Sequence, residues 1–404
     1  MQQRKINRLM RFADVFGLQR NLVLLLATIA LITTGEELWM RFLPKYLQAL
    51  GAGVLIIGAF DALRTALGAI YAYPGGIFVD RWGHRRALVG FTLLSIAGYA
   101  LVALVPHWSA VIGGMFLFLA WTCFSLPATF SLVGASLAAD RHAMGIAVQS
   151  FVKRLPIIVG PLLGGMLIDH FGLIPGVRLG LLVSCGLGSV ALAVQLRIRE
   201  TPRVLTPTLD NFWSIAKSMS PGLRRLLLSD ILIRFCERLP FAWVVIYSMD
   251  FVRVNAKGVG LLTAIEMMTA MACTIPASYF ADKYKREPFI IATFVFFTLF
   301  PISLLVATTF PLLILAFVVR GFKEFGEPAR KAQIIGYCPV ELRGRMIGCY
   351  YMIRDLIVAT GAILGAALWK FGPEVNFMVA AFLGFTGTIF YCVTYFRNSH
   401  APPR

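Results

Sequence analysis

The residues that could do chemistry in this chain are charged side chains set inside long apolar segments. A charged group at the centre of a bilayer costs about 2.5–3.5 kcal/mol on insertion scales, so it persists where it is paired or lines a wet cavity. A buried carboxylate can take up a proton from one aqueous side and release it to another, because burial disfavours its charged form. The candidate proton-binding acids are Glu36, Glu37, Glu266 and Asp61.

Among these acids, Glu36 and Glu37 are the leading pair. They are adjacent, so each disfavours ionisation of the other, and Arg41 can offset only one of them at short range. Glu266 comes next, because it stands alone in its apolar segment. The charged residues that are candidates to line a cavity are Arg41, Arg64, Lys153, Arg154, Arg234, Glu237, Arg238, Arg320, Glu324, Arg354 and Asp355.

Ion pairing along single helices is the alternative interpretation of these charges. Residues three or four apart lie on one face of a helix and can neutralise each other. This spacing joins Glu37 with Arg41, Asp61 with Arg64, Arg234 with Glu237, Arg320 with Glu324, and Lys323 with Glu327.

The chain as a whole is too apolar for a soluble protein. Of its 404 residues, 58% are hydrophobic and 14% charged, against about 45–50% and 25% in an average globular chain. Apolar runs of about 20 residues, which cross about 30 Å of hydrocarbon as a helix, follow one another along the sequence. The expected fold is all-α and integral to the membrane, with twelve transmembrane helices at 22–48, 53–79, 86–106, 109–135, 143–171, 175–197, 224–250, 257–281, 288–308, 310–336, 345–371 and 374–396.

The net charge of +18 reports membrane topology rather than a nucleic-acid partner. Most Lys and Arg residues precede the first span or lie in alternate loops, which is the excess that cytoplasmic loops carry. We therefore expect both termini in the cytoplasm. The seven cysteines show no paired spacing and predict neither disulfides nor metal ligands.

Two related halves make up the sequence. We expect residues 1–197 and 224–404 to form six-helix bundles, joined by a cytoplasmic linker at 198–223 that includes a short amphipathic piece around 212–219. Landmarks recur between the halves: Pro74 and Asp80 as Pro276 and Asp282 after 202 residues, and Pro127, Gly160 and Gly164 as Pro328, Gly361 and Gly365 after 201. Parallel repeats of this kind place a substrate site near the bilayer midplane.

The turn after the second span carries Gly76-x-x-x-Asp80-Arg81-x-Gly83-x-Arg85-Arg86. This pattern resembles the signature loop of the major facilitator superfamily, and the span count, the central loop and the half-repeat extend the resemblance over essentially the whole chain. It implies two pseudo-symmetric bundles that transport by alternating access. It also implies that Asp80 latches the first half to the start of the eleventh helix, where a helix N-terminus favours an anion. For the arginines, the alternative is a basic turn that sets topology.

The fifth span contains Gly160-Pro161-x-x-Gly164-Gly165, which resembles the core of the family's antiporter motif. The upstream glycines of that motif are replaced by Ala147 and Pro156. Close packing of helices through small residues is the alternative. The pattern favours antiport, as in exporters of drugs and other small molecules.

The charges also match the family's architecture. They fall on seven of the eight helices that the resemblance places around the central cavity. The half-repeat relates Arg64 to Glu266, Glu37 to Glu237 and Arg154 to Asp355, at offsets of 202, 200 and 201.

We therefore expect a secondary transporter in a bacterial inner membrane that exports a small-molecule solute. It would act as a monomer surrounded by membrane lipid, with the proton as coupling ion and no metal or organic cofactor. Proton-coupled uptake of an organic anion, sodium coupling, and a non-transporting receptor or scaffold remain alternatives. No nucleotide-binding or metalloprotease motif occurs, so an enzyme is not expected.

Overall fold

The computed structural model describes residues 20–136, 142–198, 212–284, 286–339 and 342–399, and every regular element in these ranges is a helix. Within them, the side chains of 72–81, 124–136 and 142–151 and of a few single residues, Lys153 and Asp282 among them, are not described. The elements are α2 (Arg20–Glu37), η1 (Met40–Phe42), α3 (Leu43–Ala49), α4 (Val54–Trp82), α5 (His84–Leu104), α6 (Trp108–Ser136), α7 (His142–Phe171), α8 (Leu173–Gln195), α9 (Phe212–Lys217), α10 (Pro221–Arg238), α11 (Trp243–Ile246), η3 (Tyr247–Phe251), α12 (Ala256–Lys283), α13 (Glu287–Val306), α14 (Phe310–Phe322), α15 (Glu327–Gly336), α16 (Arg343–Trp369) and α17 (Pro373–Ser399).

These helices occupy all twelve of the predicted spans. Nine helical stretches of the described chain are long and apolar enough to cross a membrane. Of the other three, the apolar stretch described in α6 is short, ending at Cys123, and the seventh and tenth spans are each divided into shorter helices. The all-α membrane fold is thus confirmed, and the count of twelve is consistent with it. The amphipathic piece expected in the linker forms the short helix α9.

Contacts between helices divide the chain into two compact units. Unit 1 comprises Met1–Arg41 with Ile70–Pro207, and unit 2 comprises Phe42–Ala69 with Thr208–Arg404. The segment around α3 and the first half of α4 therefore belongs to unit 2. The division into two bundles that are contiguous in sequence remains a prediction.

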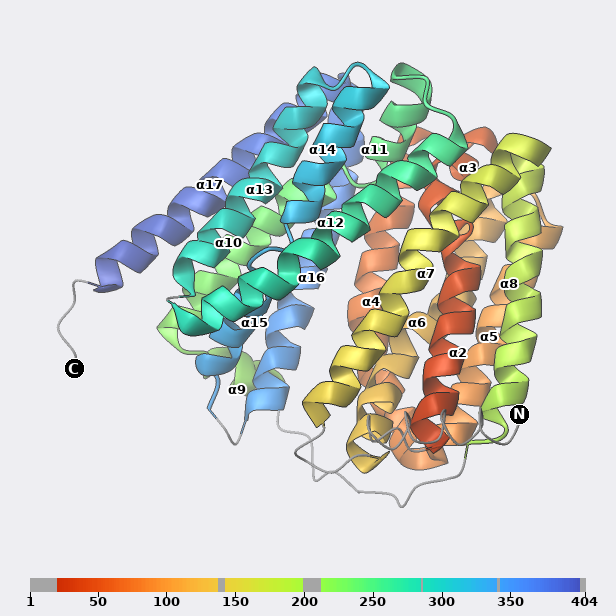
Figure 1. The fold of residues 1–404 in the computed structure, drawn as a ribbon, viewed down its shortest axis with the longest axis horizontal. Helices are drawn as coiled ribbons and strands as arrows, with labels where there is room; N and C mark the ends of the chain where they lie inside the picture. The colour runs from red at the N-terminus through yellow and green to blue at the C-terminus, as the bar shows by residue number, and fades with distance from the viewer. Residues whose placement is uncertain (1–19, 137–141, 199–211, 285, 340–341, 400–404) are drawn as a thin grey trace, which may run out of the picture. The chain divides into compact units, whose positions relative to one another are not determined.

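Unit 1 is organised around α2. This helix packs against α7 and α8, and α5 packs against α6 and α8; Figure 1 shows α2, α7 and α8 side by side. The apolar core includes Leu25, Ile29, Phe91 and Trp121, all at most 6% exposed. The helices of unit 1 are apolar on nearly all sides, so their association depends on close packing. Small residues allow this packing because they let the helix backbones approach closely.

Unit 2 is organised in the same way around α10. This helix packs against α16 and α17, while α13 packs against α17 and α12 against α14. The helix ends at Arg238 and is followed by Leu239 and Pro240, where carbonyl groups lose their helical partners. The buried Asn376 of α17 donates hydrogen bonds to the carbonyl oxygens of Leu239, at 3.2 Å, and Gly365, at 2.8 Å. The carbonyl oxygen of Leu239 therefore has a hydrogen-bond partner although the helix has ended.

The half-repeat is visible in these contacts. A Cβ atom added at Gly164 would lie 1.8 Å from the carbonyl oxygen of Leu38, and one added at Gly365 would lie 2.3 Å from that of Leu239. Both pairs are separated by the same offset of 201 residues, as are the ends of α2 and α10. At this offset the residue that aligns with Glu237 is Glu36, rather than Glu37.

Candidate functional site

Glu36 occupies a buried site in unit 1, at the end of α2. Its carboxylate is 7% exposed and accepts hydrogen bonds from two hydroxyl groups. The Tyr99 hydroxyl of α5 donates to Oε1 at 2.7 Å, and the Thr122 hydroxyl of α6 lies 2.9 Å from both carboxylate oxygens. Tyr99 is buried, whereas Thr122 is exposed, so the carboxylate lies one side chain away from the protein surface.

Aromatic packing fixes this site. The Trp39 ring meets Tyr99 and Phe118 edge to face, with ring centroids 5.8 and 5.2 Å apart. The Trp39 indole donates a hydrogen bond to Ser184 Oγ at 2.9 Å, and Ser184 donates to the carbonyl oxygen of Gly35 at 2.8 Å. The residue preceding Glu36 is thus tied to α8, which leaves the carboxylate little freedom.

Glu37 faces α7, where the sequence placed the antiporter-like motif. A Cβ atom at Gly160 would lie 2.5 Å from Glu37 Cβ, so only glycine fits there. Pro161, Gly164 and Gly165 are buried in the same helix. The motif therefore does provide close helix packing, and its bias towards antiport stays a prediction. Arg41 and Arg154 are half-buried, and the side chain of Lys153 lies outside the described residues.

Unit 2 holds a buried network of charges. Arg330 Nη1 lies 2.6 Å from Asp230 Oδ2, and both side chains are 1% exposed. Arg330 also donates to both oxygens of Glu327, at 3.1 and 2.7 Å, and Arg234 donates to Glu327 Oε1 at 2.8 Å. These charge-assisted contacts are shorter and stronger than neutral hydrogen bonds, and they satisfy ions that have left water.

The network continues to Glu237, the counterpart of Glu36. Glu237 accepts hydrogen bonds from Arg234 at 2.8 Å and Lys323 at 2.9 Å. Lys323 also donates to Glu266 Oε1 at 3.2 Å, and Arg320 Nε lies 3.1 Å from the same oxygen. Glu266 is 1% exposed, and its charge is balanced within the protein by the two cations Arg320 and Lys323.

Arg354 and Asp355 complete this network on α16. Arg354 lies 3.3 Å from Asp230 Oδ2 and 2.7 Å from Asp355 Oδ1. Tyr350, one turn earlier, donates its hydroxyl to Asp230 at 3.0 Å. Five basic and five acidic residues are joined in this way: Asp230, Arg234, Glu237, Glu266, Arg320, Lys323, Glu327, Arg330, Arg354 and Asp355. We call them the unit 2 charge network. Glu324, at the break between α14 and α15, is half-buried beside it.

Asp61 belongs to a second ionic group of unit 2. Its carboxylate is 3.2 Å from Arg238 Nη1 and 3.4 Å from Arg64 Nη2. Both guanidinium groups lie over the Phe241 ring, with distances to the centroid of 4.8 Å for Arg238 and 5.3 Å for Arg64. Cation–π contacts of this type hold a cation that has lost part of its hydration.

The turn after α4 contains the signature loop. Gly83 has a φ of 82°, in the region that favours glycine, and it stands at the turn between α4 and α5. Arg85 is half-buried and Arg86 is exposed. The side chains of Gly76, Asp80 and Arg81 lie outside the described residues, so the proposed latch is still a prediction.

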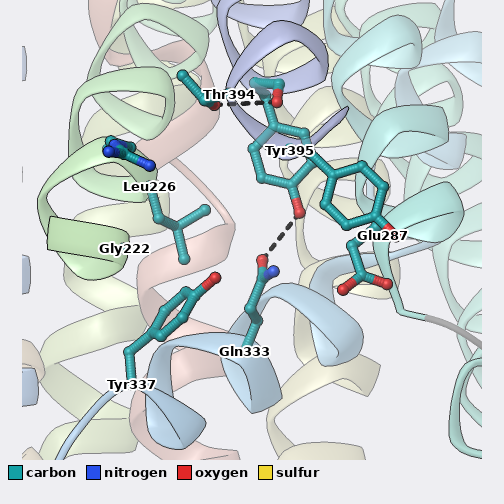
Figure 2. A pocket seen from close by; sticks show the side chains of 9 residues that line it. Gly222, Leu226, Glu287, Gln333, Tyr337, Thr394 and Tyr395 are labelled. Carbon is teal, nitrogen blue, oxygen red and sulfur yellow. Dashed lines mark hydrogen bonds between the residues drawn. The ribbon is translucent and has the colours of Figure 1, made fainter. Parts of the chain in front are cut away.

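A cavity of about 200 Å³ lies elsewhere in unit 2, between the ends of α10, α13, α15 and α17 (Figure 2). Tyr391 donates a hydrogen bond across it to Gln333 at 2.9 Å. Burial raises the pKa of Tyr337, and the Glu287 carboxylate adds to this effect. None of the predicted proton-binding or cavity residues lines it.

Asp230, Arg330 and Tyr350 were absent from the sequence-based set. Asp230 stands four residues before Arg234, and Arg330 three after Glu327, which is the spacing already used to find pairs. Both could have been found by that rule. Tyr350 gave no such signal, because its partner lies 120 residues away in the chain.

Comparison with known proteins identifies the family to which this chain belongs. A family model described as Major Facilitator Superfamily matches residues 24–255 and 226–404, which together cover nearly the whole chain. The chain belongs to the Major Facilitator Superfamily. Proteins of this superfamily are membrane transporters and not enzymes, so the chain is a multi-pass membrane transporter of small-molecule solutes.

Relatives of this superfamily transporter include two proteins named for multidrug resistance. The chain is 22% identical over 365 residues to the multidrug resistance protein MdtG of Serratia proteamaculans, covering 85% of this chain and 86% of that protein. It is 22% identical over 362 residues to a multi-drug resistance efflux pump PmrA homolog of Lactococcus lactis, covering 87% and 88%.

Solved structures share its fold. A POT family transporter in complex with a thioalcohol-conjugated peptide matches with a TM-score of 0.78 at 14% identity, covering 94% of this chain and 96% of the other. The nucleoside transporter NupG matches with a TM-score of 0.78 at 12% identity, covering 93% and 100%. At these identities the likeness concerns the fold alone.

Proposed function

We propose that this transporter is a proton-coupled exporter of small organic molecules in a bacterial inner membrane, and that Glu36 carries the coupling proton. The observation that supports it is that the hydroxyl groups of Tyr99 and Thr122 hydrogen-bond to the buried Glu36 carboxylate. Tyrosine and threonine hydroxyls both donate and accept hydrogen bonds. They can donate to the ionised carboxylate and accept from the protonated acid, so both states of Glu36 keep partners in a buried site.

Two of the other candidate acids, Asp61 and Glu266, suit this role less well. Asp61, Glu266 and Glu237 each accept from arginine or lysine. Guanidinium and ammonium groups have donors and no acceptor. A carboxylate facing them is satisfied only while it is ionised, which favours a fixed charge over a proton carrier.

Export is supported by the relatives and by the packing motif. Two relatives are named as multidrug proteins, one of them as an efflux pump. The Gly160 motif resembles that of antiporters, and α7 packs through it directly against Glu37. In the proposed cycle, Glu36 binds a proton from the outside and releases it to the cytoplasm while the solute moves outwards. We expect the transporter to work as a monomer with both termini in the cytoplasm.

Flux into proteoliposomes tests this function. Vesicles with an acidic lumen and a clamped membrane potential would be offered tetraphenylphosphonium as a cation, chloramphenicol as a neutral solute and fluorescein as an anion. An antiporter accumulates at least one of them as protons leave the lumen. Glu36→Gln should abolish this accumulation, whereas Glu374→Gln, at an exposed acid of α17, should keep it.

Three results would count against the proposal. Accumulation driven by an acidic exterior would show symport, and therefore uptake. Accumulation that persists in Glu36→Gln would remove Glu36 from the coupling step. No movement of any probe would favour a receptor or scaffold.

A further inference from the structure

The cavity between the ends of α10, α13, α15 and α17 has a polar lining that contains no member of the unit 2 charge network (Figure 2). Its volume of about 200 Å³ is below the range of about 300–1,000 Å³ that is typical of sites for drug-sized molecules. The cavity is therefore small for a drug-sized solute, but it can admit a small charged group.

The packing of α10 against α17 creates this cavity. Deeper in unit 2 the two helices touch through a glycine, because a Cβ atom added at Gly387 would lie 2.9 Å from Leu232 Cβ. Residues three and four apart share one face of a helix. Towards the end of α17, the face of Gly387 carries the larger residues Tyr391, Thr394 and Tyr395. The glycine brings the helices together, and the cavity forms where larger side chains take its place.

Two side chains of opposite charge line the cavity. Arg225 lies near the start of α10, and Glu287 is the first residue of α13. Burial raises the pKa of Tyr337, the Glu287 carboxylate raises it further, and the Arg225 guanidinium lowers it. Both charges thus act on the same hydroxyl group. The cavity therefore offers a cation and an anion to a ligand within a small space.

Neutral polar groups complete the lining. Tyr391, which is 5% exposed, donates a hydrogen bond to Gln333 Oε1 at 2.9 Å. Gly222 lets the Tyr337 ring lie against α10, since an added Cβ atom would be 2.8 Å from Tyr337 Cε1. Hydroxyl and amide groups can donate hydrogen bonds to an anion. The faces of tyrosine rings attract an ammonium group.

The cavity lies where helices of unit 2 begin and end. The helices α10 and α13 begin beside it, and α15 and α17 end near it. The predicted topology assigns these ends to the cytoplasmic face of the membrane, where tyrosines are enriched at the level of the lipid headgroups. Leu228, three residues further into α10 than Arg225, is 47% exposed, so an apolar surface adjoins the charged one.

We propose that this cavity binds the zwitterionic headgroup of a membrane phospholipid, with the phosphate at Arg225 and a primary ammonium at Glu287. Phosphatidylethanolamine carries both groups. Arginine and hydroxyl groups suit the phosphate, whereas the carboxylate and the tyrosine rings suit the ammonium. The acyl chains would lie along the apolar surface that includes Leu228. This site does not depend on the proposed function, which concerns Glu36.

Native mass spectrometry of the full chain, purified in detergent and offered defined lipids, tests this site. Phosphatidylglycerol has the phosphate but lacks the ammonium, so it meets the Glu287 carboxylate without a compensating charge. The wild type should therefore retain phosphatidylethanolamine about tenfold more tightly than phosphatidylglycerol, which is the effect of about one charge-assisted contact. Equal binding of the two lipids would overturn the proposal, and this comparison needs no variant.

Glu287→Gln separates the two lipids. It removes the partner of the ammonium, so phosphatidylethanolamine should bind about tenfold more weakly, while phosphatidylglycerol should bind as well or better. Arg225→Gln should weaken both lipids. Arg224→Gln, at a neighbouring exposed arginine that does not line the cavity, is the control and should change neither. A lipid preference that is unchanged in Glu287→Gln would also overturn the proposal.

Soluble O-phosphoethanolamine distinguishes the free headgroup from the intact lipid. If it displaces phosphatidylethanolamine from the wild type, the cavity recognises the two charged groups alone. If the lipid stays bound, its acyl chains are needed as well. Either result, together with the expected lipid preference, supports the site.

Discussion

Glu36 and Glu237 stand at the same place in two repeats, where their helices end and a glycine of another helix packs closely beside them. Around Glu36 the described donors are the hydroxyls of Tyr99 and Thr122; around Glu237 they are Arg234 and Lys323. A duplicated scaffold has thus kept its backbone and its carboxylate while its polar partners diverged. A buried acid whose neighbours can also accept hydrogen bonds keeps those partners in both protonation states, whereas a carboxylate that faces cations keeps them only while it is ionised.

The largest expected effect concerns the stability of the unit 2 charge network. Arg330→Met should destabilise unit 2 by about 3–5 kcal/mol, because it leaves Asp230 and Glu327 without their closest cation in a buried site. Thermal unfolding of the purified protein, followed by tryptophan fluorescence, measures this. Arg224→Met, at an exposed arginine of α10, is the control and should change stability by less than about 0.5 kcal/mol. Equal unfolding temperatures of the two variants would show that the unit 2 charge network does not contribute to stability.

The next effect tests the equivalence of the repeats. Gly164→Ala and Gly365→Ala should each cost about 1–3 kcal/mol, because the added methyl group meets a backbone carbonyl that cannot move aside. Gly186→Ala, where nothing lies within 4 Å of the added atom, should be tolerated. Thermal unfolding of the three variants gives the comparison. If only one of the two buried glycines proves sensitive, the alignment of Glu36 with Glu237 loses its structural basis.

The smallest expected effect concerns the hydrogen bond that Tyr99 donates to Glu36. Tyr99→Phe removes one donor to the ionised Glu36 while leaving the aromatic packing in place. The pH at which proton-driven transport is half-maximal should rise by about one pH unit, or about 1.4 kcal/mol, since the carboxylate loses stabilisation relative to the acid. Tyr279→Phe, at an exposed tyrosine, serves as the control. An unchanged pH profile in Tyr99→Phe would mean that this hydroxyl does not set the protonation of Glu36.

Much of this architecture could be predicted from the sequence, because membrane spans are long and apolar and the repeat leaves Pro and Gly at fixed offsets. The breaks were harder to foresee. The first, seventh and tenth spans were each predicted as one transmembrane helix without the position of a break. In the structure α2, α10 and α14 end inside these spans, and at the end of α10 the carbonyl group of Leu239 accepts a hydrogen bond from Asn376 of another helix. That partner lies 137 residues from Leu239 and carries no local signal.

The sequence predicted the acidic residues of the candidate site, but it did not predict the hydroxyl groups that donate hydrogen bonds to Glu36. Charged residues in apolar segments are conspicuous, so Glu36, Glu237 and Glu266 were found directly. The hydroxyls that distinguish Glu36 are ordinary Tyr and Thr residues 63 and 86 positions away, which only the folded chain brings together. The offset of 201 residues between Thr122 and Lys323 was present in the sequence, and the structure adds that Thr122 contacts Glu36 and Lys323 contacts Glu237.

The most direct test of the account is an infrared pH titration that compares Glu36→Gln with Glu237→Gln in the same membrane. The account predicts that Glu36→Gln removes the carboxyl band that titrates, and that Glu237→Gln leaves this band in place, because Glu237 remains ionised beside Lys323 and Arg234. A band that survives in Glu36→Gln and disappears in Glu237→Gln would contradict it.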